Sequence, residues 1–148
     1  MLRELLNEDI IKLDVNAKTW QNAIYEVGDL LLKAGKVEEK YIKAMIDTVN
    51  EMGAYIVMAN GVAMPHARPE NGAKDIGFSL ITLKNPIAFG NEEYDPVRVI
   101  IAICALDHNS HIELLKDIML LLEDDDFIEK INNCKDKVEI INLLKSYI

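Results

Sequence analysis

Apolar residues recur at helical spacing in the first third of the chain. From Thr19 onward they keep to one face of a helix, at Trp20, Ala23, Ile24, Val27, Leu30 and Leu31. Thr19 is the predicted N-cap of this helix, and Gly35 is its predicted stop. A second helix is predicted over residues 37–52, followed by Gly53, where a left-handed cap residue would sit. Its predicted inward positions are Val37, Tyr41, Ala44, Met45 and Met52.

The middle of the chain has the pattern of β-strands. The expected strands are residues 10–13, 55–58, 62–64, 76–83 and 97–105. The turn pair Asn60-Gly61 separates the second from the third. Residues 97–105 are apolar except for Arg98, which predicts a central strand covered on both faces.

Helices are expected again in the last third of the chain. They are placed from Ser110 to about Leu122, near Phe127 and near Val138. Asp136 with Glu139 forms a capping-box pattern for the last one. Helices on both sides of a cluster of strands predict an α/β (α+β) fold, a three-layer α/β/α sandwich with a mixed central sheet. No linker or repeat interrupts the chain, so residues 1–148 are expected to form one domain.

Composition and charge restrict the class of protein. Half of the 148 residues are apolar, which is enough for one domain with a real core. The formal net charge of −9 argues against nucleic acid or an anionic membrane as the main partner. Cys104 and Cys134 have no CxxC neighbour, so neither a redox motif nor a zinc knuckle is indicated. The first residues include acids where a signal peptide needs an apolar stretch, and no apolar run reaches transmembrane length. A cytoplasmic protein is therefore expected.

The stretch Gly61–Gly72 carries the first candidate chemistry. Pro65 and Pro69 each push the preceding residue out of helical space, so this segment is expected to be stiff and extended. His66 and Arg68 should then share one face, about 7 Å apart along the backbone. A neutral imidazole can act as a nucleophile near neutral pH, and a guanidinium can grip phosphate oxygens. The alternative is a surface histidine and arginine in a proline-rich loop, because an isolated PxHxRP pattern has low specificity.

A second candidate lies in the stretch Asp107–Leu115. Ser110 and Glu113 form a capping box, which predicts a helix with Ser110 at its start and His111 in its first turn. Free backbone N–H groups at a helix start favour anions, so His111 and Ser110 could both lie beside a phosphate. The preceding strand would deliver this helix start to the carboxyl end of a central strand, a favoured place for sites in open α/β sheets.

A metal site is an alternative interpretation of the same stretch. His108 and His111 are three residues apart beside Asp107, as a metal-dependent hydrolase could require. The capping box would put His108 before the helix, however, and no HExxH or cysteine ligand set occurs. The GxxxxGK[ST], GxGxxG and GxSxG motifs are also missing. Two histidines and an arginine without a nucleotide cradle favour phosphoryl relay over transfer from ATP, and we expect neither a metal nor a cofactor.

A series of further segments occurs in a characteristic order. They are Gly61–Glu70, Gly77–Leu80, Pro86–Asn91, Asp95–Val97 and Asn109–His111. Together they resemble the enzyme IIA domains of the phosphoenolpyruvate-dependent sugar phosphotransferase system, of the mannitol/fructose type. The resemblance covers nearly the whole chain. It implies a mixed sheet between helical layers and a phosphotransferase that acts as a phosphohistidine carrier. The sequence ends just after its last predicted helix, so a stand-alone IIA polypeptide is expected.

The resemblance also implies roles and partners. His66 would be the phosphorylated histidine, and His111 would orient it or contact the phosphoryl oxygens. The donor would be HPr, itself phosphorylated by enzyme I, and the acceptor would be a cysteine of a IIB component. The IIC permease would take part only indirectly. Neither nucleic acid nor direct sugar binding is expected, and the oligomeric state is left open.

The chain departs from the common family pattern in two places. Many members have glycine after the active histidine, where this chain has Ala67. Several carry an arginine shortly upstream, but none lies between Arg3 and Arg68 here, so the phosphate-binding guanidinium is most simply Arg68. The Pro-His-Ala-Arg-Pro-Glu form, together with Gly53–Val57, resembles the L-ascorbate-type branch. A regulatory IIA-like protein that signals through phosphorylated His66 is an alternative, beside the metal-dependent hydrolase that would use His108 and His111.

Overall fold

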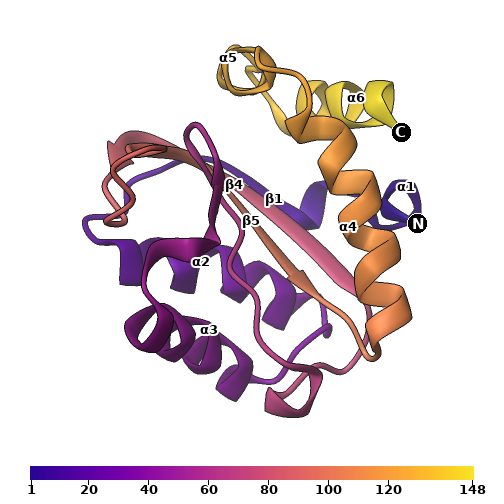
Figure 1. Cartoon of the computed structure of the whole chain (residues 1–148). Helices are drawn as coiled ribbons and strands as arrows, with labels where there is room; N and C mark the ends of the chain where they lie inside the picture. The colour runs from indigo at the N-terminus through magenta and orange to yellow at the C-terminus, as the bar shows by residue number, and fades with distance from the viewer.

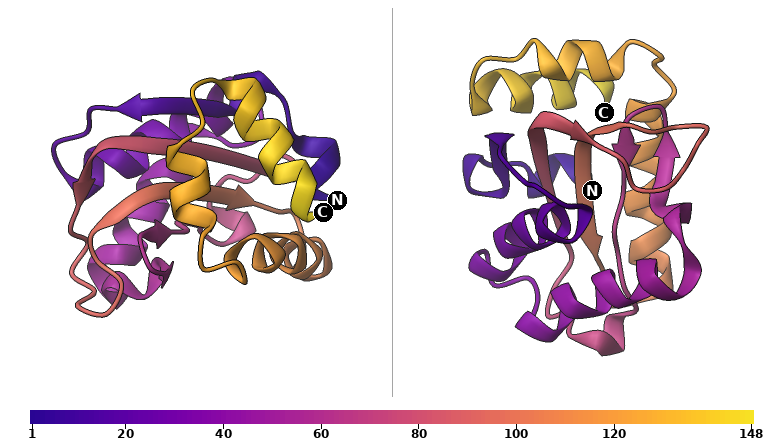
Figure 2. Two further views of the ribbon diagram at one scale, coloured as in Figure 1. Left: turned by 90° about the horizontal axis from the view of Figure 1, so that it is seen from above. Right: turned by 90° about the vertical axis from the view of Figure 1, so that its left-hand side faces the viewer.

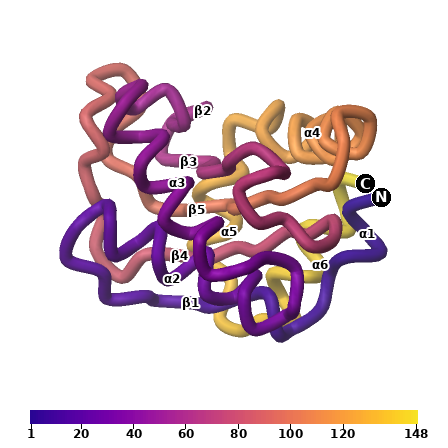
Figure 3. The backbone as a smooth tube through the Cα atoms, turned by 90° about the horizontal axis from the view of Figure 1, so that it is seen from below, coloured from indigo at the N-terminus to yellow at the C-terminus, as the bar shows by residue number.

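The computed structural model describes the whole chain, residues 1–148, around a five-stranded mixed sheet. The strands are β1 (Ile11–Val15), β2 (Val57–Ala59), β3 (Val62–Ala63), β4 (Gly77–Ile87) and β5 (Val97–Cys104). Their order across the sheet is β1-β4-β5-β3-β2, which Figure 3 shows from below. The β1/β4 and β3/β5 pairs are parallel, whereas β4/β5 and β2/β3 are antiparallel.

Helices cover both faces of this sheet (Figures 1 and 2). They are α1 (Leu2–Leu5), α2 (Trp20–Lys33), α3 (Glu39–Met52), α4 (His108–Leu122), α5 (Phe127–Asn132) and α6 (Lys137–Tyr147). Three short 3₁₀ turns are η1 (Glu8–Ile10), η2 (Ala54–Ile56) and η3 (Pro69–Asn71). Helices α2 and α3 pack on one face, and α1, α4, α5 and α6 pack on the other. The three-layer α/β/α sandwich with a mixed sheet is thus confirmed.

Strand β5 joins the two hydrophobic cores because successive side chains of a strand point to opposite faces. Ile100 and Ala102 belong to the core under α2 and α3. Val99 and Ile101 belong to the core under α4 and the C-terminal helices. All four are fully buried, which confirms the central, doubly covered strand expected from the apolar run.

The predicted helix ends are largely as the sequence indicates. The Thr19 hydroxyl accepts a hydrogen bond from the backbone N–H of Asn22 at 3.1 Å, which is an N-cap contact. Gly35 and Gly53 have φ angles of 74° and 79°, the left-handed region that ends a helix. The Asp136 carboxylate caps α6 by accepting from the N–H of Glu139.

Several sequence expectations are wrong in detail. Met52, expected inward, has 67% of its surface exposed, because the last turn of α3 borders an open cavity. Val37 is buried but precedes α3 and forms an isolated bridge with Ala73. Strand β4 runs to Ile87 instead of Leu83, because its backbone pairing continues beyond the core through exposed residues.

The expectation about membrane spans is a separate matter. None of the helices combines the length and hydrophobicity needed to span a bilayer.

Candidate functional site

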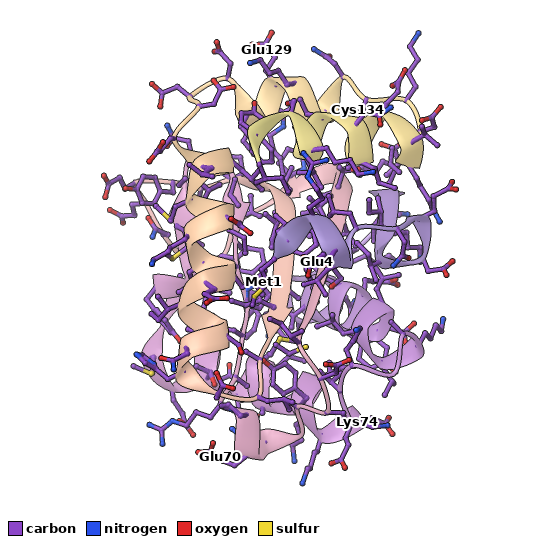
Figure 4. All side chains as sticks on the ribbon, turned by 90° about the vertical axis from the view of Figure 1, so that its right-hand side faces the viewer. Met1, Glu4, Glu70, Lys74, Glu129 and Cys134 are labelled. Atoms are coloured by element: carbon purple, nitrogen blue, oxygen red, sulfur yellow. The ribbon has the colours of Figure 1, made fainter.

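A cavity of about 740 Å³ opens at the end of the sheet where α4 begins. Turn η3 and the start of α4 lie together at this end, and α5 lies at the opposite end (Figure 1). Figure 4 marks the two ends with Glu70, which lines the cavity, and Glu129 on α5. The lining residues include His66, Arg68, Asp107, His108 and His111. The fold therefore brings together the two stretches that the sequence singled out.

Residues 64–68 form no helix, strand or turn, and Arg68, which precedes Pro69, has extended φ and ψ angles of −72° and 149°. Strand β3 pairs in parallel with β5 as far as Ala63, opposite Ile100. The next residues leave the ladder, since Pro65 has no N–H to donate to a sheet. The Met64 N–H instead donates to the carbonyl of Ile56 at 2.8 Å, which anchors the chain just before His66. His66 therefore lies just beyond the point where the chain of β3 stops pairing with β5.

A backbone carbonyl fixes the His66 ring. Nδ1 of His66 lies 2.9 Å from the carbonyl oxygen of Met64. A carbonyl can only accept, so Nδ1 carries the proton and donates it. In the neutral ring Nε2 is then the nitrogen with a free lone pair. The sequence could not name the group that holds this proton, because the partner is a main-chain atom two residues away.

His111 lies beside this ring on the fourth residue of α4. The two ring centroids are 5.8 Å apart, with planes inclined at 46°. Burial lowers the pKa of His111 from its ordinary value, and the nearby His66 and His108 lower it further. The ring of His111 is therefore held neutral near neutral pH, when it can donate one hydrogen bond and accept another.

The other two predicted site residues, Arg68 and Ser110, differ in whether they line the cavity. Arg68 is exposed, lines the cavity and makes no ion pair with an acid. Ser110 does not line the cavity, and its backbone N–H donates to the Asp107 carboxylate at 2.7 Å. Asp107, not Ser110, is therefore the N-cap of α4, and the predicted Ser110 capping box is wrong. The N–H expected to face a phosphate is already bound to Asp107.

Helix α4 starts earlier than expected, which also changes the metal alternative. His108 is the first residue of the helix, so it lies on α4 with His111. Even so, no group of three or more His, Cys, Asp or Glu side chains is arranged to hold a metal ion. The donor set that the hydrolase alternative needs is not assembled.

Two tyrosines at the site were not predicted to be functional. The Tyr55 ring meets the His66 ring edge-on, with centroids 6.1 Å apart and planes at 85°. Tyr41, which the sequence indicated only as a core residue of a helix, lines the cavity floor. The sequence did contain a signal for the role of Tyr41, because a tyrosine hydroxyl that is predicted to be buried needs a hydrogen-bond partner.

Comparison with known proteins identifies the family. The family model described as "Phosphoenolpyruvate-dependent sugar phosphotransferase system, EIIA 2" matches residues 4–147. The chain belongs to this family. It is 41% identical over 145 residues to the "Ascorbate-specific PTS system EIIA component" of Escherichia coli (strain K12), across 97% of this chain and 94% of that protein.

Two solved structures of EIIA proteins share the fold of this EIIA chain. The mannitol-specific cryptic phosphotransferase enzyme IIA CmtB from Escherichia coli has a TM-score of 0.88 and 33% identity, covering 98% of each chain. Enzyme IIAMTL from Escherichia coli, in complex with phosphorylated enzyme IIBMTL, has a TM-score of 0.83 and 28% identity, covering 95% of this chain and 97% of its own. The protein is thus a phosphoryl carrier of the phosphotransferase system, which accepts from HPr and passes to a IIB component.

Proposed function

We propose that Nε2 of His66 is the atom that carries the phosphoryl group. The observation that supports this most strongly is the contact between Nδ1 of His66 and the Met64 carbonyl at 2.9 Å. It keeps the proton on Nδ1 and leaves the lone pair of Nε2 free to attack phosphorus. The ring lines a cavity that is large enough to admit a donor's phosphorylated side chain.

In the first step a bond forms between Nε2 of His66 and the phosphorus of phospho-HPr, while the donor's nitrogen–phosphorus bond breaks. The transfer is roughly in line, and negative charge spreads over three oxygens. Arg68 supplies an exposed guanidinium that lines the cavity and forms no ion pair with an acid of this chain. His111 donates a hydrogen bond to a phosphoryl oxygen from its position beside His66. We assign no phosphate contact to Ser110, because Asp107 occupies its N–H.

In the second step a cysteine thiolate of the IIB component attacks the same phosphorus. The bond to Nε2 breaks, and its electron pair returns to the imidazole, which is again neutral. The Met64 carbonyl holds the Nδ1 proton throughout, so no proton needs to leave the ring between cycles. We propose that the chain is a phosphotransferase component that works in the cytoplasm, in keeping with a family match over residues 4–147.

We further propose an ascorbate-type transporter as the destination of the phosphoryl group. The basis is identity of 41–42% to ascorbate-specific EIIA components over nearly the whole chain, against 28–33% for the mannitol-type structures. The residues of the cavity contact donor and acceptor proteins and not the sugar-like substrate. The test of this assignment is therefore whether the chain passes its phosphoryl group to an ascorbate-type IIB component.

Intact-mass measurement with phosphoenolpyruvate, enzyme I and HPr tests the carrier role. Wild type is expected to gain a single phosphoryl group and to lose it when an ascorbate-type IIB component is added. His66→Ala is expected to gain none. His108→Ala is the matched control, since it removes a histidine from the same cavity without touching the acceptor, and it is expected to load fully. Full loading of His66→Ala would overturn the assignment.

A further inference from the structure

Tyr41 joins the two segments that carry His66 and His111. Its side chain comes from α3 and is almost completely buried, with 1% of its surface exposed. The backbone N–H of Ala67, the residue after His66, donates to Tyr41 Oη at 3.1 Å. The same hydroxyl oxygen lies 2.8 Å from the carbonyl oxygen of Ile103 and 3.2 Å from that of Ala67. One hydroxyl thus contacts the backbone of the segment after His66 and the backbone of β5.

The position of this hydroxyl follows from the way β3 leaves β5. The two strands pair at Val62/Val99 and Ala63/Ile100. Continued at the same offset, the register would place His66 opposite Ile103 and close the gap with direct backbone bonds. Pro65 interrupts that ladder, and the Tyr41 hydroxyl occupies the gap in its place. It accepts from the Ala67 N–H and donates to the buried Ile103 carbonyl, two groups that the interrupted ladder leaves apart.

The hydroxyl remains protonated and keeps a fixed direction. Burial raises the pKa of Tyr41, so its O–H donates over the whole physiological pH range. The shorter contact, to Ile103, takes the single proton, and the oxygen accepts from Ala67. Ile103 leads within a few residues to Asp107, the N-cap of α4, and so to His111.

We propose that Tyr41 is a positioning residue for phosphoryl transfer, whose hydroxyl sets the distance and orientation of His66 relative to His111. This inference rests on the proposed role of His66. Tyr41 acts through backbone atoms and does not touch the phosphoryl group. Without the hydroxyl, the Ala67 segment is free to shift against β5, and the His66 ring moves relative to His111. Displacements of about 1 Å at a reacting group cost up to about a hundred-fold in rate.

The test is Tyr41→Phe, which removes only the hydroxyl, compared with Tyr147→Phe. Tyr147 is the matched control because its hydroxyl also makes a hydrogen bond, to Asp124, at the far end of the molecule. Transfer from phospho-HPr is followed by rapid quench and intact mass, and the ring signals of His66 and His111 are followed by ¹H–¹⁵N NMR. Thermal unfolding fixes an assay temperature at which each protein is folded. If Tyr41→Phe is partly unfolded there, trimethylamine N-oxide is added to all samples.

Tyr41→Phe is expected to transfer about ten-fold more slowly or worse, with altered ring signals of both histidines. Tyr147→Phe is expected to match wild type in both measurements. Wild-type transfer by Tyr41→Phe would overturn the inference, and so would slow transfer with unchanged ring signals, because that result would show that the hydroxyl does not act by positioning the two rings. Failure of wild type itself to gain a phosphoryl group would instead overturn the proposed role of His66.

Discussion

At His66, the chemistry of one side chain is set by a neighbouring backbone carbonyl. The Met64 carbonyl selects the tautomer, and His111 stands 5.8 Å away as a second ring whose pKa is lowered by burial and by the other histidines. The Met64 contact leaves Nε2 of His66 free to act as the nucleophile, and the lowered pKa of His111 suits a neutral hydrogen-bond donor. A phosphoryl group on His66 changes this balance, because it places negative charge next to His111.

Phosphorylation of His66 is expected to raise the pKa of His111. The unphosphorylated chain holds that pKa below the ordinary value of 6.5, so the ring takes up a proton only at lower pH. Phosphoryl oxygens favour the protonated ring, so phosphorylation should be accompanied by proton uptake in the window between the two pKa values. NMR titration of His111 in both forms checks this. Identical titration curves would show that the phosphoryl group does not contact His111.

Individual residues differed in how readily the sequence predicted them. His66 and Arg68 were expected on one face because Pro65 and Pro69 restrict the local backbone, and both line the same cavity. Tyr41 was predicted only as core, because its hydroxyl partners lie 26 and 62 residues away and no local pattern records them. Long-range contacts of this kind appear only when the fold is known.

At the scale of elements, the first residues of α4 and of β4 shape the site. One is the start of α4, where the sequence predicted a Ser110 capping box but the Asp107 carboxylate accepts from the Ser110 N–H and caps the helix. The other is the start of β4, where Gly77 faces Cys104 of β5. A Cβ at Gly77 would lie 2.8 Å from Cys104 Sγ and 3.0 Å from Lys36 Cβ. The closeness of this pairing holds β5 in register at the end that leads to α4.

Gly77→Ala is expected to lower the free energy of unfolding by about 1–3 kcal/mol, the usual cost of overpacking. Adding Cys104→Ala removes the sulfur that the new methyl group meets, so the two costs should be less than additive. Urea unfolding of both single variants and the double variant measures this coupling. Strictly additive costs would mean that the sulfur is not the atom that resists the methyl group.

At the scale of the whole molecule, the end that holds the cavity, near Glu70, lies opposite the end formed by α5 and α6, near Glu129 (Figure 4). The three-layer fold was predictable because β5 is apolar on both faces, which demands a helical layer on each side.

A polar network around Asp124 connects the C-terminal helices, and no sequence pattern indicated it. The Asp124 carboxylate accepts from Lys130 Nζ, from the Tyr147 hydroxyl and from the Asp126 N–H, and so ties α5 and α6 to the end of α4.

Asp124→Asn is expected to lower Tm at neutral pH without changing phosphoryl transfer. The hydrogen bonds from Lys130 and Tyr147 lower the pKa of Asp124 from 3.8 to about 2. Because the pKa of this carboxyl group is lower in the folded state, its contribution to the free energy of unfolding is complete above pH 3.8. That contribution is lost as the pH falls through about 2. The Tm difference from wild type should therefore shrink in strong acid. Asp125→Asn is the control, since the Asp125 side chain makes no hydrogen bond or ion pair, and an equal loss of Tm in that variant would contradict the role of the network.

The most direct test of the central claim is to locate the phosphoryl group by ³¹P and ¹H–¹⁵N NMR, after loading with phosphoenolpyruvate, enzyme I and HPr. The Met64 contact predicts a single phosphohistidine, with phosphorus bonded to Nε2 of His66 and a proton retained on Nδ1. Phosphorus on Nδ1 of His66, or on His108 or His111, would contradict the claim.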